Sequence, residues 1–316
     1  MPKRMADYTL ADWSRLRPLT QNYKTLRYRL LNAVYMRRRP LKGNLGELAG
    51  YIRDKNVLVT IAFSDPQVIE WQAQLMRAYV SRPLFLIADN SDNNEAAAVI
   101  ETIAERHGAP YVRLPTNPWG PGSRSHGISL NWVWRNIIRP GQPEAFGFLD
   151  HDLFPTAPDD PFAALSTQDF YGQVRTAGPR WFLWAGFCVF RFESVRHKPL
   201  DFGQDWFLGL DTGGGNWEVL YRHVNRAALL EPACSEAPFR PGLDIKDGPF
   251  QWFGTWVHEV RHAGRIELAG EKREHLGRLL APHLAAARAR FAVRDPNNAL
   301  EGDRLNTCKT SGRRTQ

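Results

Sequence analysis

The chain has 316 residues, of which 43% are hydrophobic, and its formal net charge is +8. This length can bury a large core, either in one large α/β domain or in two small ones. No apolar run approaches the roughly 18 residues that cross a bilayer, and no signal-peptide core follows the first residues, so these features argue against an integral membrane protein. The three cysteines, Cys188, Cys234 and Cys308, form no Cys-x-x-Cys pair and are typical of a reducing cytoplasm.

Positive charge is concentrated in the first fifty residues, where eleven Lys or Arg accompany only three Asp or Glu. Residues 19–39 place Tyr23, Leu26, Leu30 and Val34 at helical spacing with basic residues between them, which predicts an amphipathic helix. Two interpretations of this helix stay open. It packs on the domain with a solvated basic face, or it docks on a membrane surface or a partner. In both cases residues 1–50 form a basic helical extension.

After residue 50 the pattern changes to strands that alternate with helices. Residues 56–63 form a continuous apolar run, as expected for a parallel strand that is covered on both faces. Such alternation predicts an α/β fold with a doubly wound, mostly parallel sheet flanked by helices. Further strands are predicted at residues 83–88, 110–114 and 145–149, and helices at residues 66–79, 95–107 and 123–138.

Polar groups follow the ends of several predicted strands. In a doubly wound sheet, ligands bind outside the carboxyl ends of the strands, so Ala62, Phe63, Asp89, Asp150 and Asp152 should lie along one rim. Residues i and i+2 of a strand point to the same side. Asp150 and Asp152 can therefore reach one Mg²⁺ or Mn²⁺ together with the phosphate that it binds.

Beyond residue 155 the alternation is looser. Strands are expected at residues 170–174, 185–192 and 251–260, a Gly-rich turn at 209–216, and helices at 217–224 and 271–293. Residues 294–316 are polar and are expected to form a flexible tail. The predicted catalytic domain spans residues 51–293, with a nucleotide-binding half at 56–155 and an acceptor half at 156–293.

Four segments of the first half occur in a characteristic order. They are a strand at residues 57–63, a strand with an acidic turn at 86–92, a loop that opens a helix at 117–127, and Leu149-Asp150-His151-Asp152. In this order and spacing they resemble the motifs of the family-2 glycosyltransferases of GT-A fold. The resemblance covers roughly residues 56–155. His126 departs from it, because the family often has Asn at that position.

The resemblance implies roles for individual positions. Asp89 would accept hydrogen bonds from a nucleotide base, Asp150 would contact the ribose or the metal, and Asp152 would hold the Mn²⁺ or Mg²⁺ that bridges the diphosphate. The donor would be a UDP-, dTDP- or GDP-linked sugar, and the acceptor a carbohydrate, a lipid-linked molecule or a protein. The expected nucleotide contacts are Ala62, Phe63, Asp89, Asn117, Arg124 and Asp150.

Residues of the second half would complete such a site. Asp211 is the expected general base for the acceptor hydroxyl, although Leu210 precedes it where the family often has Glu, and its alternative role is to cap the following turn. His258 and His262 are the candidates for the remaining metal ligand, and His262 is favoured because a flexible basic segment follows it. Trp184 and Trp217 are expected to contact the acceptor, since sugar rings stack on aromatic faces.

Three functions are compatible with these patterns. The first is a metal-dependent glycosyltransferase in the cytoplasm, without a nucleic-acid partner and with peripheral membrane contact through its basic segment. The second is a sugar-phosphate nucleotidyltransferase, which is disfavoured because Ser64-Asp65-Pro66 follows the first strand in place of a Gly-rich cationic loop. The third is a non-catalytic basic protein that binds an anionic membrane or nucleic acid.

Overall fold

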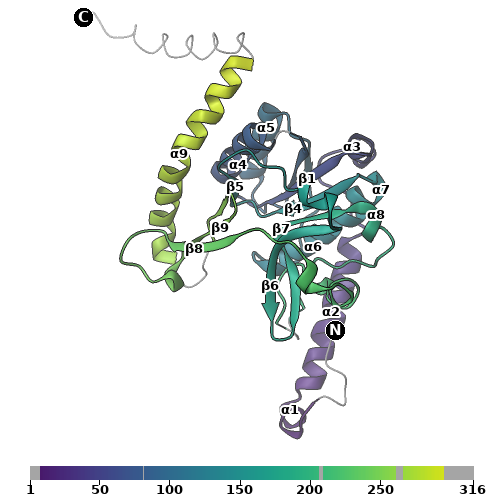
Figure 1. The fold of residues 1–316 in the computed structure, drawn as a ribbon. Helices are drawn as coiled ribbons and strands as arrows, with labels where there is room; N and C mark the ends of the chain where they lie inside the picture. Colours follow the sequence, from purple (N-terminus) through teal and green to yellow (C-terminus); the bar gives the residue numbers. More distant parts are fainter. Residues whose placement is uncertain (1–7, 81, 206–208, 261–265, 295–316) are drawn as a thin grey trace, which may run out of the picture.

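A six-stranded sheet with the strand order β3-β2-β1-β4-β7-β6 forms the centre of the molecule (Figure 1). The computed structural model describes residues 8–80, 82–205, 209–260 and 266–294. Strands β3, β2, β1 and β4 are parallel, whereas β7 runs antiparallel to both β4 and β6. This mixed sheet between helices confirms the predicted α/β class with a mostly parallel sheet. The strands are β1 (Asn56–Ala62), β2 (Leu84–Asp89), β3 (Tyr111–Arg113), β4 (Ala145–Leu149), β6 (Phe170–Ala177) and β7 (Arg180–Arg191).

Helices cover both faces of this sheet, which explains why every residue of β1 after Asn56 is buried. Val57, Val59 and Ile61 of β1 belong to one core cluster, together with residues of α3 and α6. Successive side chains of a strand point to opposite faces of the sheet. Leu58 therefore lies on the other face, where it packs in a second cluster with residues of α4 and α9. The helices are α3 (Leu45–Ile52), α4 (Pro66–Tyr79), α5 (Asn94–His107), α6 (Ser123–Val133), α7 (Arg139–Gly141), α8 (Phe192–Val195) and α9 (Ala269–Arg294).

Local signals at the helix ends explain why several predicted boundaries are correct. The Asp65 side chain accepts a hydrogen bond from the Val68 N–H at the start of α4. Gly108 ends α5 in the left-handed conformation, with φ of 66°. The predicted helix 123–138 is instead α6 followed by a π-helical turn, Trp134–Ile138.

A smaller antiparallel sheet, with the order β5-β10-β9-β8, lies beside the first one. The prediction of a single strand at 251–260 is wrong, because the chain turns back at Gly254, whose φ of 59° suits glycine, and forms a hairpin. The predicted helix 217–224 is also wrong. This segment begins after three glycines and has no side-chain cap, so it forms only short 3₁₀ turns. The Tyr221 side chain in it is fully buried. The strands are β5 (Leu153–Pro155), β8 (Cys234–Pro238), β9 (Pro249–Phe253) and β10 (Trp256–His258).

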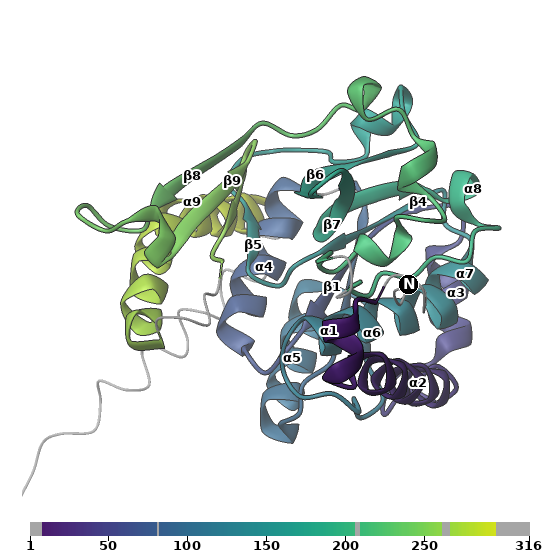
Figure 2. The same cartoon turned by 90° about the horizontal axis from the view of Figure 1, so that it is seen from below.

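Two helical pieces flank this body. Helix α9 packs along α4, where the Gln74 side chain donates to the Leu284 carbonyl. Helices α1 (Leu10–Ser14) and α2 (Arg17–Tyr35) lie beyond the opposite side of the sheet (Figure 2). Among the described residues, no helix is both long and apolar enough to cross a bilayer. The tail at 295–316 lies outside the described residues, and the division into extension, two catalytic halves and tail stays a prediction.

Candidate active site

The Asp-His-Asp segment occupies the turn between β4 and β5. The Asp150 N–H donates to the Gly186 carbonyl of β7, so the first aspartate follows directly from the central sheet. The Glu259 N–H donates to the Asp152 carbonyl, which ties the second aspartate to the smaller sheet. In that sheet β10 pairs with β5 so that His258 lies opposite Leu153. Strand pairing therefore carries His258 to the aspartates from far along the chain.

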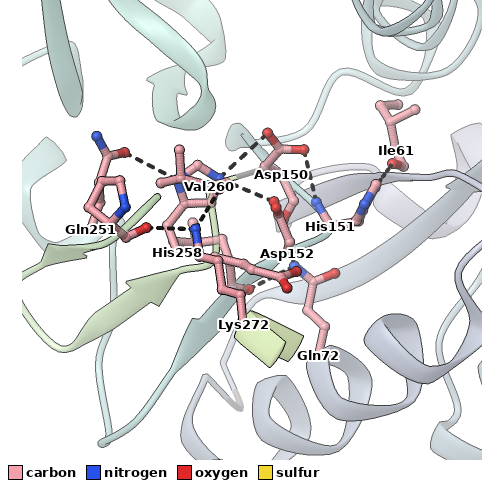
Figure 3. A network of polar contacts seen from close by, with 12 residues as sticks. Ile61, Gln72, Asp150, His151, Asp152, Gln251, His258, Val260 and Lys272 are labelled. Atoms are coloured by element: carbon pink, nitrogen blue, oxygen red, sulfur yellow. Dashed lines mark hydrogen bonds and ion pairs between the residues drawn. The ribbon is translucent and has the colours of Figure 1, made fainter. Parts of the chain in front are cut away.

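Asp150, Asp152 and His258 form one compact cluster of potential metal ligands (Figure 3). One ligand atom from each lies within 4.8 Å of the others. The His258 Nε2 atom is 3.2 Å from Asp152 Oδ1 and 3.9 Å from Asp150 Oδ2. Asp152 and His258 are both 4% exposed, whereas Asp150 is half-buried and faces the cavity. Two carboxylates and one imidazole at this spacing are a suitable donor set for Mn²⁺ or Mg²⁺.

Surrounding polar groups hold these ligands in place. The His258 Nδ1 atom lies 3.2 Å from Gln251 Oε1, and this contact assigns the ring proton to Nδ1 and leaves the Nε2 lone pair toward the aspartates. The buried Gln72 side chain of α4 donates to the carbonyls of Asp150 and Leu153, at 2.7 and 2.9 Å. The backbone of the Asp-His-Asp turn is thus fixed from beneath by a helix.

A charged network lies behind the cluster and fixes the end of β10. Arg273 binds both carboxylate oxygens of Glu259 and also Asp65 Oδ2, at 2.6 to 2.9 Å. Lys272 donates to the carbonyls of Pro249 and Val260, and burial lowers its pKa to about 8. These contacts join α9 to the same strand that carries His258.

A cavity of about 430 Å³ opens in front of the cluster, a size typical of small-molecule sites. The carboxyl ends of β1, β2 and β4 contribute to it, together with the start of α6 and the loop that contains Asp211. The predicted convergence of strand ends is therefore observed. Its wall includes Ile61, Phe63, Asn90, Ser123, His126, Asp150, Asp152, Arg175, Trp184, Asp211 and His258.

Asp211 belongs to the cavity wall, in the loop after α8. Its Oδ2 atom is 3.2 Å from an Arg175 guanidinium nitrogen, and Gln204 donates to Oδ1. The Arg175 guanidinium also stacks 4.2 Å above the Trp184 ring. Burial lowers the pKa of Arg175, and the neighbouring Asp211 acts in the opposite direction. Trp184 in turn packs against His258, with ring centroids 4.8 Å apart.

The other predicted site residues lie away from the cavity wall. Asp89 is fully buried, where its carboxylate accepts hydrogen bonds from Ser91 and from the Tyr111 hydroxyl. Trp217 packs against the hydrophobic core. The Ala62 carbonyl accepts a hydrogen bond from the N–H of the cavity residue Asn90, and the Asn117 side chain donates to the Asn90 side chain. Arg124 is exposed, 5.7 Å from the Trp119 ring centroid, and His262 lies outside the described residues.

Sequence reasoning missed Gln72, Gln251 and Arg175. Gln251 stands opposite His258 in the β9–β10 ladder, so only a prediction of this hairpin could have paired them. Arg175 occupies a partly buried position of β6, and no local sequence signal separates it from a surface arginine. Gln72 lies on the buried face of α4. A polar residue within an apolar helix face was the signal that could have indicated a buried hydrogen-bonding role.

Fold and site together define an α/β protein with a mixed, mostly parallel sheet and a candidate divalent-cation centre at the edge of a ligand-sized cavity. No protein-family model and no curated protein matches the chain. Three similar solved structures lie at low identity. The glucosyl-3-phosphoglycerate synthase from Mycobacterium tuberculosis, in complex with Mn²⁺ and UDP-glucose, is 16% identical with a TM-score of 0.38, and the match covers 77% of this chain and 84% of that one.

The mannosyltransferase PcManGT from Pyrobaculum calidifontis, in complex with GDP-Man and Mn²⁺, is 13% identical with a TM-score of 0.43, covering 95% and 92% of the two chains. S. aureus TarS is 14% identical with a TM-score of 0.28, covering 37% and 21%. Because these TM-scores are below 0.5, the fold assignment rests on the strand order of this chain.

Proposed function

We propose that this protein is a metal-dependent glycosyltransferase that moves a sugar from a nucleoside-diphosphate donor to a hydroxyl acceptor. The observation that carries the proposal is the convergence of Asp150, Asp152 and His258 at the carboxyl end of β4, on the wall of a cavity. These three side chains would hold Mn²⁺ or Mg²⁺. The cation would supply positive charge to the leaving diphosphate.

The donor nucleotide would lie along the ends of β1 and β2. Phe63 and Asn90 line the cavity there, and Asp150 borders it on the side of the cluster. Asn90 is positioned by the Ala62 carbonyl and by the side chains of Asn117 and Ser125. Asp89 would then act mainly by holding the turn that presents Asn90, since its carboxylate is already bound to Ser91 and Tyr111. The base of the donor would be uracil, thymine or guanine.

Asp211 would act as the general base. In the proposed step it takes the proton of the acceptor hydroxyl, the acceptor oxygen forms a bond to the anomeric carbon, and the bond to the diphosphate breaks. Arg175 would orient the Asp211 carboxylate through their 3.2 Å contact. Trp184 would form the wall against which the acceptor lies, because its ring borders both Arg175 and His258. The reaction would take place in the cytoplasm, where Cys188 and Cys234 remain free thiols.

The loop after β1 favours sugar transfer over nucleotidyl transfer. Asp65 of this loop caps α4 and binds Arg273. The position that would carry a Gly-rich cationic loop in a nucleotidyltransferase therefore holds a carboxylate that is bound elsewhere.

Calorimetric titration with UDP, dTDP and GDP, each with and without Mn²⁺, tests the proposal. We expect one nucleotide to bind in a metal-dependent manner, with binding lost in Asp152→Ala and retained in Asp169→Ala, which changes an exposed carboxylate outside the cavity wall. The matching sugar nucleotide should then be hydrolysed slowly, with water as the acceptor. Absence of nucleotide binding under both conditions would overturn the proposal.

A further inference from the structure

Helix α2 carries an apolar stripe that nothing in the described chain covers. Leu19, Tyr23, Leu26, Leu30 and Val34 are three or four residues apart and therefore share one face of the helix. Each of these side chains is between 54 and 67% exposed. We call these five residues the α2 stripe. An exposed patch of large apolar side chains is typical of a docking surface.

The stripe lies opposite the face by which α2 packs on the protein. Tyr28, Asn32 and Tyr35 occupy that inner face, about half a turn away from the stripe. The Tyr28 ring packs 5.5 Å from Trp119, Asn32 accepts a hydrogen bond from the Trp119 indole, and Tyr35 is 1% exposed. Because the inner face is already occupied, the stripe does not belong to the core. Figure 1 shows α2 reaching beyond the central sheet, with α1 at its far end.

Basic residues border the α2 stripe, and their charge indicates that the binding partner is anionic. Between Asp12 and Glu47 the chain contains nine Lys or Arg and no acidic residue. Arg27 lies on one flank of the stripe and Arg29 on the other, given 100° of rotation per residue. On the Arg29 side the surface continues into a second cavity, of about 540 Å³, whose wall also contains Arg135, Arg139 and Lys198. The acidic residue of that wall, Asp201, accepts a hydrogen bond from the Asn131 side chain, so the cations outnumber it.

We propose that α2 docks on the surface of an anionic phospholipid bilayer. The α2 stripe enters the boundary between headgroups and acyl chains, and the flanking cations contact lipid phosphates. A second copy of this chain is a poorer occupant, since two stripes facing each other would bring together basic flanks without an acidic partner. The inference is independent of the proposed transferase activity, because no residue of the α2 stripe lines the candidate active site.

Vesicle co-sedimentation of the full chain tests this surface. We expect binding to vesicles of phosphatidylcholine and phosphatidylglycerol, and at least about ten-fold weaker binding to phosphatidylcholine alone. The double variant Leu26→Glu/Leu30→Glu should bind the anionic vesicles at least about ten-fold more weakly. Val99→Glu is the matched control, because Val99 is 49% exposed on α5, far from α2, and should bind like the parent protein.

Circular dichroism and metal-dependent nucleotide binding should be the same for all three proteins, which separates loss of docking from loss of folding. Equal sedimentation of the stripe variant and the parent protein would overturn the proposal. So would a parent protein that forms dimers in solution and ignores vesicles, while the stripe variant is monomeric, because the occupant would then be a second copy.

Discussion

His258 Nε2 lies 3.2 Å from Asp152 Oδ1, and its other ring nitrogen contacts Gln251. Gln251 therefore decides which nitrogen of His258 faces the aspartates. Residues in this position usually change metal affinity by roughly 10- to 100-fold when they are replaced. We expect Gln251→Ala to weaken Mn²⁺ binding by about this factor, as measured by calorimetry.

Gln251→Glu is the informative partner of that variant. A glutamate keeps an oxygen acceptor for the His258 Nδ1–H but loses the amide donor that Gln251 offers to Glu236, so it should bind Mn²⁺ more tightly than the alanine variant. Equal affinities in the alanine and glutamate variants would show that the Gln251 contact does not position the imidazole.

Asp211 is expected to act in turnover and not in donor binding. If it is the general base, Asp211→Asn should lower the rate of sugar-nucleotide turnover by roughly 10²- to 10⁴-fold. The affinity for the nucleotide should stay the same, because Asp211 contacts Arg175 and Gln204 rather than the strand ends where the nucleotide is proposed to lie. Steady-state kinetics combined with calorimetry separates the two quantities. A variant that loses nucleotide affinity and keeps its turnover would exclude this role.

The backbone two residues after Asp211 tolerates no side chain. Gly213 has φ of 94°, and a Cβ atom there would lie 2.2 Å from the Leu183 carbonyl oxygen. Gly213→Ala should therefore lower the free energy of unfolding by roughly 3 kcal/mol or more, from backbone strain and a clash with backbone.

Gly178→Ala controls for the strain alone. Gly178 has φ of 59° in the β6–β7 turn, and a Cβ atom would meet nothing within 4 Å, so the expected loss is only about 1 kcal/mol. Urea denaturation measures both. Similar losses in the two variants would contradict a clash at Gly213.

An ion pair between α4 and α5 should make stability depend on acid pH. The hydrogen bond from His107 lowers the pKa of Glu70 below its usual 4.5, and Arg106 adds to this effect. A lowered carboxyl pKa stabilises the fold above pH 4.5, and that contribution disappears as the pH falls through the native pKa. We expect Glu70→Gln to be less stable than the parent protein at pH 7 by less than about 1 kcal/mol, since the pair is partly exposed.

Denaturant titrations between pH 3 and pH 7 check this prediction. The difference between the two proteins should shrink toward acid pH. A difference that is constant over the whole range would assign it to packing instead of charge.

The first half of the fold could be predicted from the sequence because its signals are local. The apolar run of β1, the Asp65 cap and Gly108 each act within a few residues, so α4 has its predicted bounds and β1 nearly so. The cluster was predictable in part, because Asp150 and Asp152 are neighbours in sequence and His258 was one of two candidate histidines. Its geometry depends on pairing of β10 with β5, which no local pattern encodes.

Gln72, Gln251 and Arg175 were missed for one physical reason, since each acts through contacts between segments that are distant in the sequence. Trp217 packs against the core, and aromatic composition does not distinguish a core position from a cavity wall, so its contact with an acceptor stays a prediction. Asp89 followed a strand as expected, but the Tyr111 hydroxyl from the next strand occupies its carboxylate.

The pairing of β5 with β10 also limits how this protein can be rebuilt. The three clustered side chains come from both sheets, so the two halves of the chain are not exchangeable modules. A chimera that replaces the smaller sheet to change the acceptor must keep the register between His258 and Leu153. A chimera with another register would lose the metal-ligand cluster as well as the original specificity. Variation in specificity is therefore expected to arise in the loops around the cavity, while the β5–β10 ladder stays constant.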